Sequence, residues 1–105
     1  MATVRHCVMG KFTPEATDEQ KQKMIEAIIG MKSELDIIVA VQAGLDLGLA
    51  ESGNSGFCAT LDFKSEADYK TYATHPVHVG VITNFIKPIL APGSRNAVQF
   101  PLSQL

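Results

Sequence analysis

The sequence predicts an α+β fold in which one antiparallel sheet carries helices on one of its faces. Two observations lead to this prediction: the chain contains four segments with strand patterns, and helical patterns separate the first from the second and the third from the fourth. The resulting order, β-α-β-β-α-β, is typical of a split βαβ arrangement. A chain of 105 residues can form one modest core, so we expect a single domain spanning residues 1–105.

The first predicted strand, "TVRHCVMGKF" at residues 3–12, alternates in hydrophobic character. One face carries Val4, His6, Val8 and Phe12, and the other carries Arg5, Cys7, Met9 and Lys11. His6 therefore lies among apolar neighbours, where an imidazole without a hydrogen-bond partner would cost roughly a few kcal/mol. We expect His6 to find a partner or a water molecule inside the protein.

The first predicted helix follows at residues 19–35. Thr17 precedes the helical pattern and Gln20 stands three residues later, which indicates a capping box. Apolar residues then recur at 4-3-4 spacing along one face, the spacing of a helix side that packs on a core. These residues are Met24, Ile28, Met31 and Leu35.

The second predicted strand, "DIIVAVQAG" at residues 36–44, reads as apolar on both faces. Ile37, Val39 and Val41 oppose Ile38 and Ala40 in the alternating pattern. Helices on one side of the sheet would leave the second apolar face in water, and the chain has few elements left to cover it. A second copy of the chain is the economical cover, so we expect a homodimer through the sheet face.

The third predicted strand is "FCATLDF" at residues 57–63. Its side chains on one face are Phe57, Ala59, Leu61 and Phe63. Ser65 followed by Asp68 opens another helix, and Pro76 starts a further helical segment because proline fits a first helical turn. The closing strand is "RNAVQF" at residues 95–100.

Composition and charge narrow the possible partners. The net charge is −2 and the Lys and Arg residues are scattered, so the chain has no basic field that would attract nucleic acid. No apolar run approaches the roughly 18 residues of a membrane span, and the first residues lack the apolar core of a signal peptide. We expect a cytoplasmic protein with no membrane partner, in which Cys7 and Cys58 are reduced, buried thiols.

The candidate chemistry lies in "TYATHPVHVGV" at residues 71–81. In a helix ending near residue 74, His75 would lie at the helix end, where its ring can cap the segment that Pro76 opens. The proline corner would let Tyr72 and His78 point into the space between the helices and the sheet, toward His6.

Three interpretations of these side chains stay open at this point. In the first, His75 caps a helix and the others are core residues whose polar atoms are satisfied. In the second, the three histidines bind a metal ion, which needs at least three converging ligands. In the third, a neutral histidine accepts a proton while a tyrosine hydroxyl stabilises the resulting oxyanion.

Several segments together resemble one known family. "RHCVMGKF", the "TDEQ" helix start and "LDFKSEADYKTYATHPVHVGV" are similar to the stress-responsive A/B barrel (Dabb) domain family, and the resemblance covers essentially the whole chain. Its most specific features are His6 and the "Y..HP.H" run of Tyr72, His75, Pro76 and His78. The resemblance implies ferredoxin-like subunits that form a dimeric α/β barrel.

One branch of this family contains the cofactor-free plant polyketide cyclase that forms olivetolic acid from a linear tetraketide thioester. By resemblance to that branch, His78 would be the base that removes a proton next to a carbonyl, and Tyr72 would stabilise the enolate or alkoxide. His6 would line the same pocket. Phe57 stands where the cyclase has a further histidine on its third strand, which implies a more apolar pocket here.

Two hypotheses from different classes follow. The first is a homodimeric enzyme without cofactor or metal that cyclises or isomerises a small hydrophobic carbonyl or aromatic compound. Its catalytic residues would be His78 and Tyr72, and its substrate-binding residues His6, Phe57 and His75. The second is a stress-associated structural or ligand-binding homo-oligomer without turnover. A cofactor-free monooxygenase is a third possibility, to which an aromatic content of 7% and the absence of tryptophan lend no support.

Overall fold

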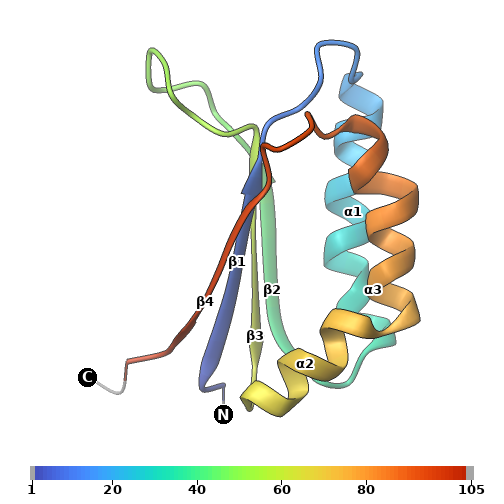
Figure 1. Cartoon of the computed structure of the whole chain (residues 1–105), viewed down its shortest axis with the longest axis vertical. Coiled ribbons are helices and arrows are strands. Elements are labelled where there is room, and N and C mark those ends of the chain that lie inside the picture. Colours follow the sequence, from blue (N-terminus) through green and yellow to red (C-terminus); the bar gives the residue numbers. More distant parts are fainter. Residues whose placement is uncertain (1, 104–105) are drawn as a thin grey trace.

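The sheet has four antiparallel strands in the order β2-β3-β1-β4, and the helices cover one of its faces (Figure 1). The computed structural model describes residues 2–103. The strands are β1 Val4–Gly10, β2 Ile38–Leu45, β3 Phe57–Phe63 and β4 Asn96–Pro101, and the α-helices are α1 Asp18–Glu34, α2 Glu66–Thr74 and α3 Pro76–Val81. The predicted α+β class, with a ferredoxin-like β-α-β-β-α-β order, is confirmed.

Helix α1 forms as its sequence predicts. The Gln20 N–H donates to Thr17 Oγ1 at 3.1 Å, and the Thr17 N–H donates to Gln20 Oε1 at 2.9 Å, so the capping box is complete. The four apolar residues predicted to share one face of this helix are all buried against the sheet. Each such side chain contributes about 1.5–3 kcal/mol by leaving water.

Strand β2 departs from the alternation that its sequence predicts. The strand is irregular between Ile38 and Ala40, because Ile38 lies opposite Phe63 and Ala40 lies opposite the next residue of β3. Val39 is the extra residue of this bulge, and beyond it the two faces are exchanged. Val41 consequently faces the helices together with Ile38, so the predicted placement of these two residues on opposite faces is wrong.

The face of the sheet away from the helices is mixed in character. Arg5 on β1 donates to both carboxylate oxygens of Asp62 on β3, at 2.7 and 2.9 Å. Apolar side chains around this ion pair are open to solvent: Met9 is 40% exposed, Val98 54% and Phe100 40%. A partner could therefore cover both an apolar surface and a fixed ion pair on this face.

The two thiols also lie on this outer face. Cys7 is partly buried and Cys58 is exposed, so the prediction of buried thiols is wrong for Cys58. Their Sγ atoms are 3.7 Å apart, and both cysteines are unbridged. Partial burial and the neighbouring Cys7 raise the pKa of Cys58, which makes it a slow nucleophile at neutral pH.

The second helical region turns sharply at His75 and loses regular α geometry after α3. A π-helical turn, η1, spans Ile82–Ile86, and a 3-10 turn, η2, spans Lys87–Ile89. Pro88 lacks the N–H that an α-helix would need at that point, so the helix ends there. Among residues 2–103, no helix is long and apolar enough to cross a bilayer.

Candidate functional site

The candidate site lies between the sheet and the second helical region, where three side chains distant in sequence meet. His6 comes from β1, Tyr72 from α2 and His78 from α3. The Tyr72 and His78 rings stack with centroids 4.0 Å apart and planes 30° from parallel. The His6 ring lies 6.0 Å from the Tyr72 ring, so one small region of the core holds all three.

His6 is held as a neutral imidazole. It is only 2% exposed, and the Gln99 side-chain N–H donates to its Nδ1 at 2.8 Å. Burial is the main cause that lowers the pKa of His6 to about 4, and the nearby positive charge of Arg95 acts in the same direction. Because Nδ1 accepts, Nε2 carries the proton and is the atom that could donate to a ligand oxygen.

His78 has the opposite tautomer. Its Nδ1 lies 3.2 Å from the carbonyl oxygen of Ala73, and since a carbonyl can only accept, Nδ1 carries the proton. The lone pair of Nε2 is therefore available to take a proton. Burial lowers the pKa of His78, so the ring is neutral at neutral pH and in the form that a base requires.

Tyr72 is a protonated hydrogen-bond donor. Its ring is buried and packs on Phe63, with centroids 5.0 Å apart. Burial raises the pKa of Tyr72 far above the neutral range, so its hydroxyl keeps its proton. Within residues 2–103 this hydroxyl makes no hydrogen bond, which leaves it able to donate to a ligand or a water.

The cavity between these side chains is small. Its walls come from the sheet, α1 and the second helical region, and they are His6, Val8, Ile28, Met31, Ala59, Leu61, Tyr72, His78, Ile82, Ile86 and Arg95. Its volume of about 20 Å³ is enough for one water molecule. A carbonyl compound of several atoms would enter only if part of this wall moved.

The structure places the two other predicted site residues elsewhere. The Nδ1 of His75 accepts from the Val77 N–H at 3.1 Å, and the His75 backbone N–H donates to the Tyr72 carbonyl at 3.1 Å. His75 thus ends α2 and caps α3, outside the cavity lining. Phe57 packs on Phe12 with centroids 5.7 Å apart and lines a hollow at the far end of the sheet, near the loop that follows β2.

Sequence reasoning missed Gln99 and Arg95. Gln99 lies directly opposite His6 in the β1–β4 register, which explains its hydrogen bond. The alternation of residues 95–100 puts a polar residue on one strand face but does not say which residue of β1 it meets, because register is set by distant contacts. Arg95 lies in the loop before β4 and has no local pattern that marks it.

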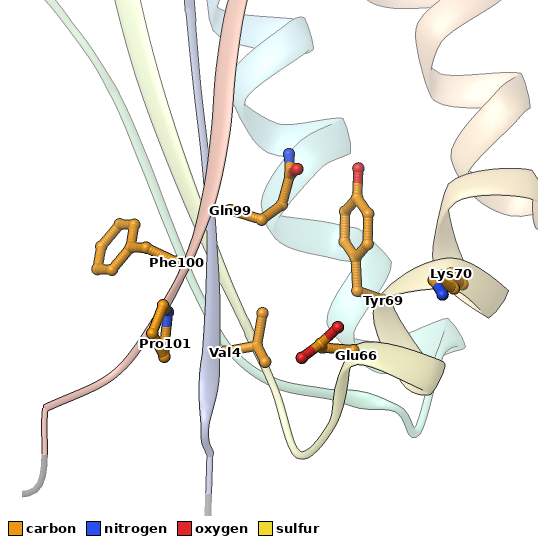
Figure 2. A pocket seen from close by; sticks show the side chains of 7 residues that line it. All are labelled: Val4, Glu66, Tyr69, Lys70, Gln99, Phe100 and Pro101. Atoms are coloured by element: carbon orange, nitrogen blue, oxygen red, sulfur yellow. The ribbon is translucent and has the colours of Figure 1, made fainter.

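A groove of about 360 Å³ lies behind His6, between α2 and β4. Figure 2 shows that Gln99 and Tyr69 extend into the space between the sheet and the helices, with Glu66 and Lys70 on α2 near its start. The Tyr69 ring lies 5.2 Å from the His6 ring and Gln99 is hydrogen-bonded to it, so two residues of this groove contact a residue that lines the inner cavity.

Metal binding has no cluster to support it in the part of the chain that the structure describes. Between residues 2 and 103, no group of three His, Cys, Asp or Glu side chains could hold a metal ion. The side chains of His6 and His78 are instead engaged by Gln99 and by the Ala73 carbonyl, respectively. The arrangement suits hydrogen bonding and proton transfer.

Comparison with known proteins places these observations in a family. The model of the stress responsive A/B barrel (Dabb) domain matches residues 4–101. A dimeric ferredoxin-like protein of unknown function from Thermobifida fusca is 31% identical, with 96% of this chain and 92% of that chain covered and a TM-score of 0.84.

Two more distant structures share the fold. A Dabb family protein from Mesorhizobium loti is 15% identical, with 98% of this chain and 100% of that chain covered and a TM-score of 0.76. A hydroxynitrile lyase from Passiflora edulis is also 15% identical, covering 99% and 96% with a TM-score of 0.83. No curated protein matches the sequence significantly.

Proposed function

Because the chain belongs to the stress responsive A/B barrel (Dabb) domain family, we propose that it performs cofactor-independent proton transfer on a small carbonyl compound. His78 would be the base, Tyr72 the oxyanion donor and His6 a second donor. The observation that carries this proposal is the Tyr72–His78 stack, in which the Ala73 carbonyl holds the proton of His78 on Nδ1. This leaves a basic nitrogen next to a phenol that keeps its proton.

The proposed reaction begins when His78 Nε2 removes a proton from the carbon next to the carbonyl. The electron pair of the broken C–H bond moves into the carbonyl to form an enolate, and the Tyr72 hydroxyl donates a hydrogen bond to its oxygen. The enolate carbon then attacks a second carbonyl in an aldol cyclisation, or takes back a proton at another carbon in an isomerisation. The His78 imidazolium returns its proton in either case, so the protein ends unchanged. The Nε2–H of His6 is a further donor for the same oxygen.

The environment of these residues supports the assignment. Burial keeps both imidazoles neutral and the phenol protonated, the states required before the first proton transfer. Most of the other lining side chains are apolar, so a developing oxyanion would interact strongly with the few donors present. The Passiflora hydroxynitrile lyase shows that this fold can hold an enzyme active site.

We also propose that the chain is a homodimer in the cytoplasm that packs through the outer face of its sheet. The 31% identical Thermobifida protein is described as dimeric, as is a similar protein from Bacteroides fragilis. The exposed side chains of Met9, Val98 and Phe100 supply an apolar surface for this contact. Burying it would contribute about 25 cal/mol for each Å² of apolar area.

The test is carbon-bound proton exchange in D₂O, followed by NMR on a panel of small ketones and β-keto thioesters. For any compound that the protein exchanges, His78→Ala should lower the rate by about 100-fold or more and Tyr72→Phe by about 10- to 100-fold. Lys32→Gln, on the exposed side of α1, is the matched control, since that lysine lies outside the cavity. Full activity in both site variants would show that the mechanism is wrong.

A second candidate function, a structural or ligand-binding role without turnover, is favoured by the cavity volume of about 20 Å³. Here Tyr72 and His78 only fill the core, and the hydroxyl of Tyr72 contacts a single water. This function predicts that no compound of the panel exchanges and that both variants only melt at a lower temperature. Thermal unfolding of the same variants separates the two functions.

A further inference from the structure

Another hollow, distinct from those described above, opens directly beside the inner cavity, at the irregular end of the second helical region. It has a volume of about 310 Å³, within the range of small-molecule sites. Its lining residues are Ile82, Lys87, Leu90, Ala91, Pro92, Gly93 and Arg95, and we call it the Lys87–Arg95 groove. Ile82 and Arg95 line both the groove and the inner cavity, so they form the partition between the two.

The charge of this groove is entirely positive. Lys87 and Arg95 are its ionisable side chains, and no carboxylate lines it. Within residues 2–103, neither side chain makes a salt bridge, whereas Arg5 on the sheet is paired to Asp62 at 2.7 Å. Two unpaired cations above an apolar floor suit a ligand with an anionic head and a short apolar body.

A tight turn directly precedes Arg95. Ser94 donates its backbone N–H to the Ala91 carbonyl at 3.1 Å, and Gly93 has a φ of +74°, which fits a type II turn with Pro92 before the glycine. The Ala91 N–H donates to the Lys11 carbonyl at 2.8 Å, which ties the turn to the end of β1. The turn therefore fixes the backbone from which the Arg95 side chain extends.

We propose that the Lys87–Arg95 groove binds a small organic anion, a carboxylate or a phosphate monoester on a short apolar chain. Arg95 and Lys87 would hold the anionic head, and the chain would lie over Ile82 and Leu90. The link between this groove and catalysis rests on the proposed function. If that function holds, the substrate is an acid whose carbonyl passes Ile82 to reach Tyr72 and His78. The π-helical turn that begins at Ile82 is the part of the partition that would move.

The electrostatics of the inner cavity agree with this geometry. The positive charge of Arg95 contributes to the lowered pKa of both His6 and His78. An anion bound to Arg95 would cancel that charge and raise both pKa values. A ligand in the groove would thereby make His78 a stronger base, which couples substrate binding to proton abstraction.

The test uses hexanoate, butyl phosphate and the neutral hexanamide as probes of the full chain, with binding followed by ¹H–¹⁵N NMR. At least one anion should bind more tightly than hexanamide, with amide shifts centred on residues 91–95, and the tighter anion identifies the preferred head group. Arg95→Gln should weaken that binding by about 10-fold or more, Arg95→Lys by less, and Lys87→Gln by roughly 3-fold. Lys32→Gln, on the exposed side of α1, is the matched control and should bind as the wild type does.

Equal binding of hexanamide and both anions, or unchanged binding in Arg95→Gln, would overturn the proposal. Shifts centred away from the groove would do the same. Because these measurements need no turnover, they separate the two proposals. Binding that depends on Arg95, in a protein that exchanges no carbon-bound proton, would support the groove and reject the proposed function. Exchange of a keto acid that is the same in wild type and Arg95→Gln would support the proposed function and reject the groove.

Discussion

The two faces of the sheet differ in how they treat polar groups. On the inner face His6 is buried and neutral, held by one hydrogen bond from Gln99 and surrounded by aromatic rings. On the outer face Arg5 and Asp62 remain charged and pair with each other. The inner face tolerates a titratable group only in its neutral form, whereas the outer face keeps charges and leaves apolar side chains open. Stability and candidate chemistry therefore belong to the inner face, and the proposed dimer contact to the outer one.

The largest expected loss of stability comes from a substitution at the centre of the inner face. Phe63 is fully buried and packs on the rings of Tyr69 and Tyr72, with centroids 5.8 and 5.0 Å away. Phe63→Ala should lower the free energy of unfolding by about 3–5 kcal/mol in urea titrations, because a cavity remains where the ring was. Val98→Ala on the outer face should change the monomer by about 0.5 kcal/mol or less. Equal losses in both variants would contradict this contrast.

Acid should destabilise the protein through His6. Its pKa is 6.5 in the unfolded chain and about 4 in the folded protein, so folding disfavours the charged form. Above pH 6.5 the ring is neutral in both states, so its titration does not change the stability; as the pH falls from 6.5 through 4 the protein loses up to about 3 kcal/mol of stability through this residue. Urea titrations of wild type and His6→Gln at pH 7 and pH 4 measure this.

The control for the acid experiment is Asn84→Gln, which replaces an exposed amide outside the cavity lining. His6→Gln should retain a bond to Gln99 yet lose much of the difference in stability between pH 7 and pH 4, while Asn84→Gln should keep that difference. If His6→Gln and the wild type lost equal stability on acidification, the buried neutral state of His6 would not be the cause.

Substitutions on the outer face should weaken the proposed dimer more than they lower the stability of the fold. Val98→Asp puts an unpaired carboxylate into the proposed dimer contact and should raise the dimer dissociation constant by about 100-fold, since burying that charge costs roughly 3 kcal/mol. Sedimentation velocity over a concentration series measures this. Leu49→Asp is the matched control, because Leu49 is exposed in the loop after β2 and lies off the sheet. A wild-type protein that sediments as a monomer would reject the dimer.

Local signals in the sequence predict the elements well. The third strand begins and ends at the residues that its alternation indicates, Phe57 and Phe63. Thr17 and Ser65 cap the two helices that their positions indicate, because a cap depends only on residues two or three places away. The bulge at Val39 was not predictable in this way, since it depends on how β2 pairs with β3.

The candidate site was predictable only in part, for the same reason. The structure brings together His6, Tyr72 and His78, as their expected positions on a strand face and a helix corner suggested. Their roles stay predictions. Gln99 and Arg95 reach the site from the last strand and the loop before it, and their places depend on register and on a turn tied to β1. The cavity volume depends on packing across the whole core, which no local pattern reveals.

The corner at His75 has a consequence for motion. The His75 backbone N–H donates to the Tyr72 carbonyl, and the His75 ring accepts from the Val77 N–H. At the same corner the His78 ring donates to the Ala73 carbonyl. The phenol of Tyr72 and the imidazole of His78 are thereby tied to the same corner of the backbone. A ligand would then enter through the wall formed by Ile82 and Arg95. The residues proposed for catalysis and those proposed for entry are therefore different and can be substituted separately.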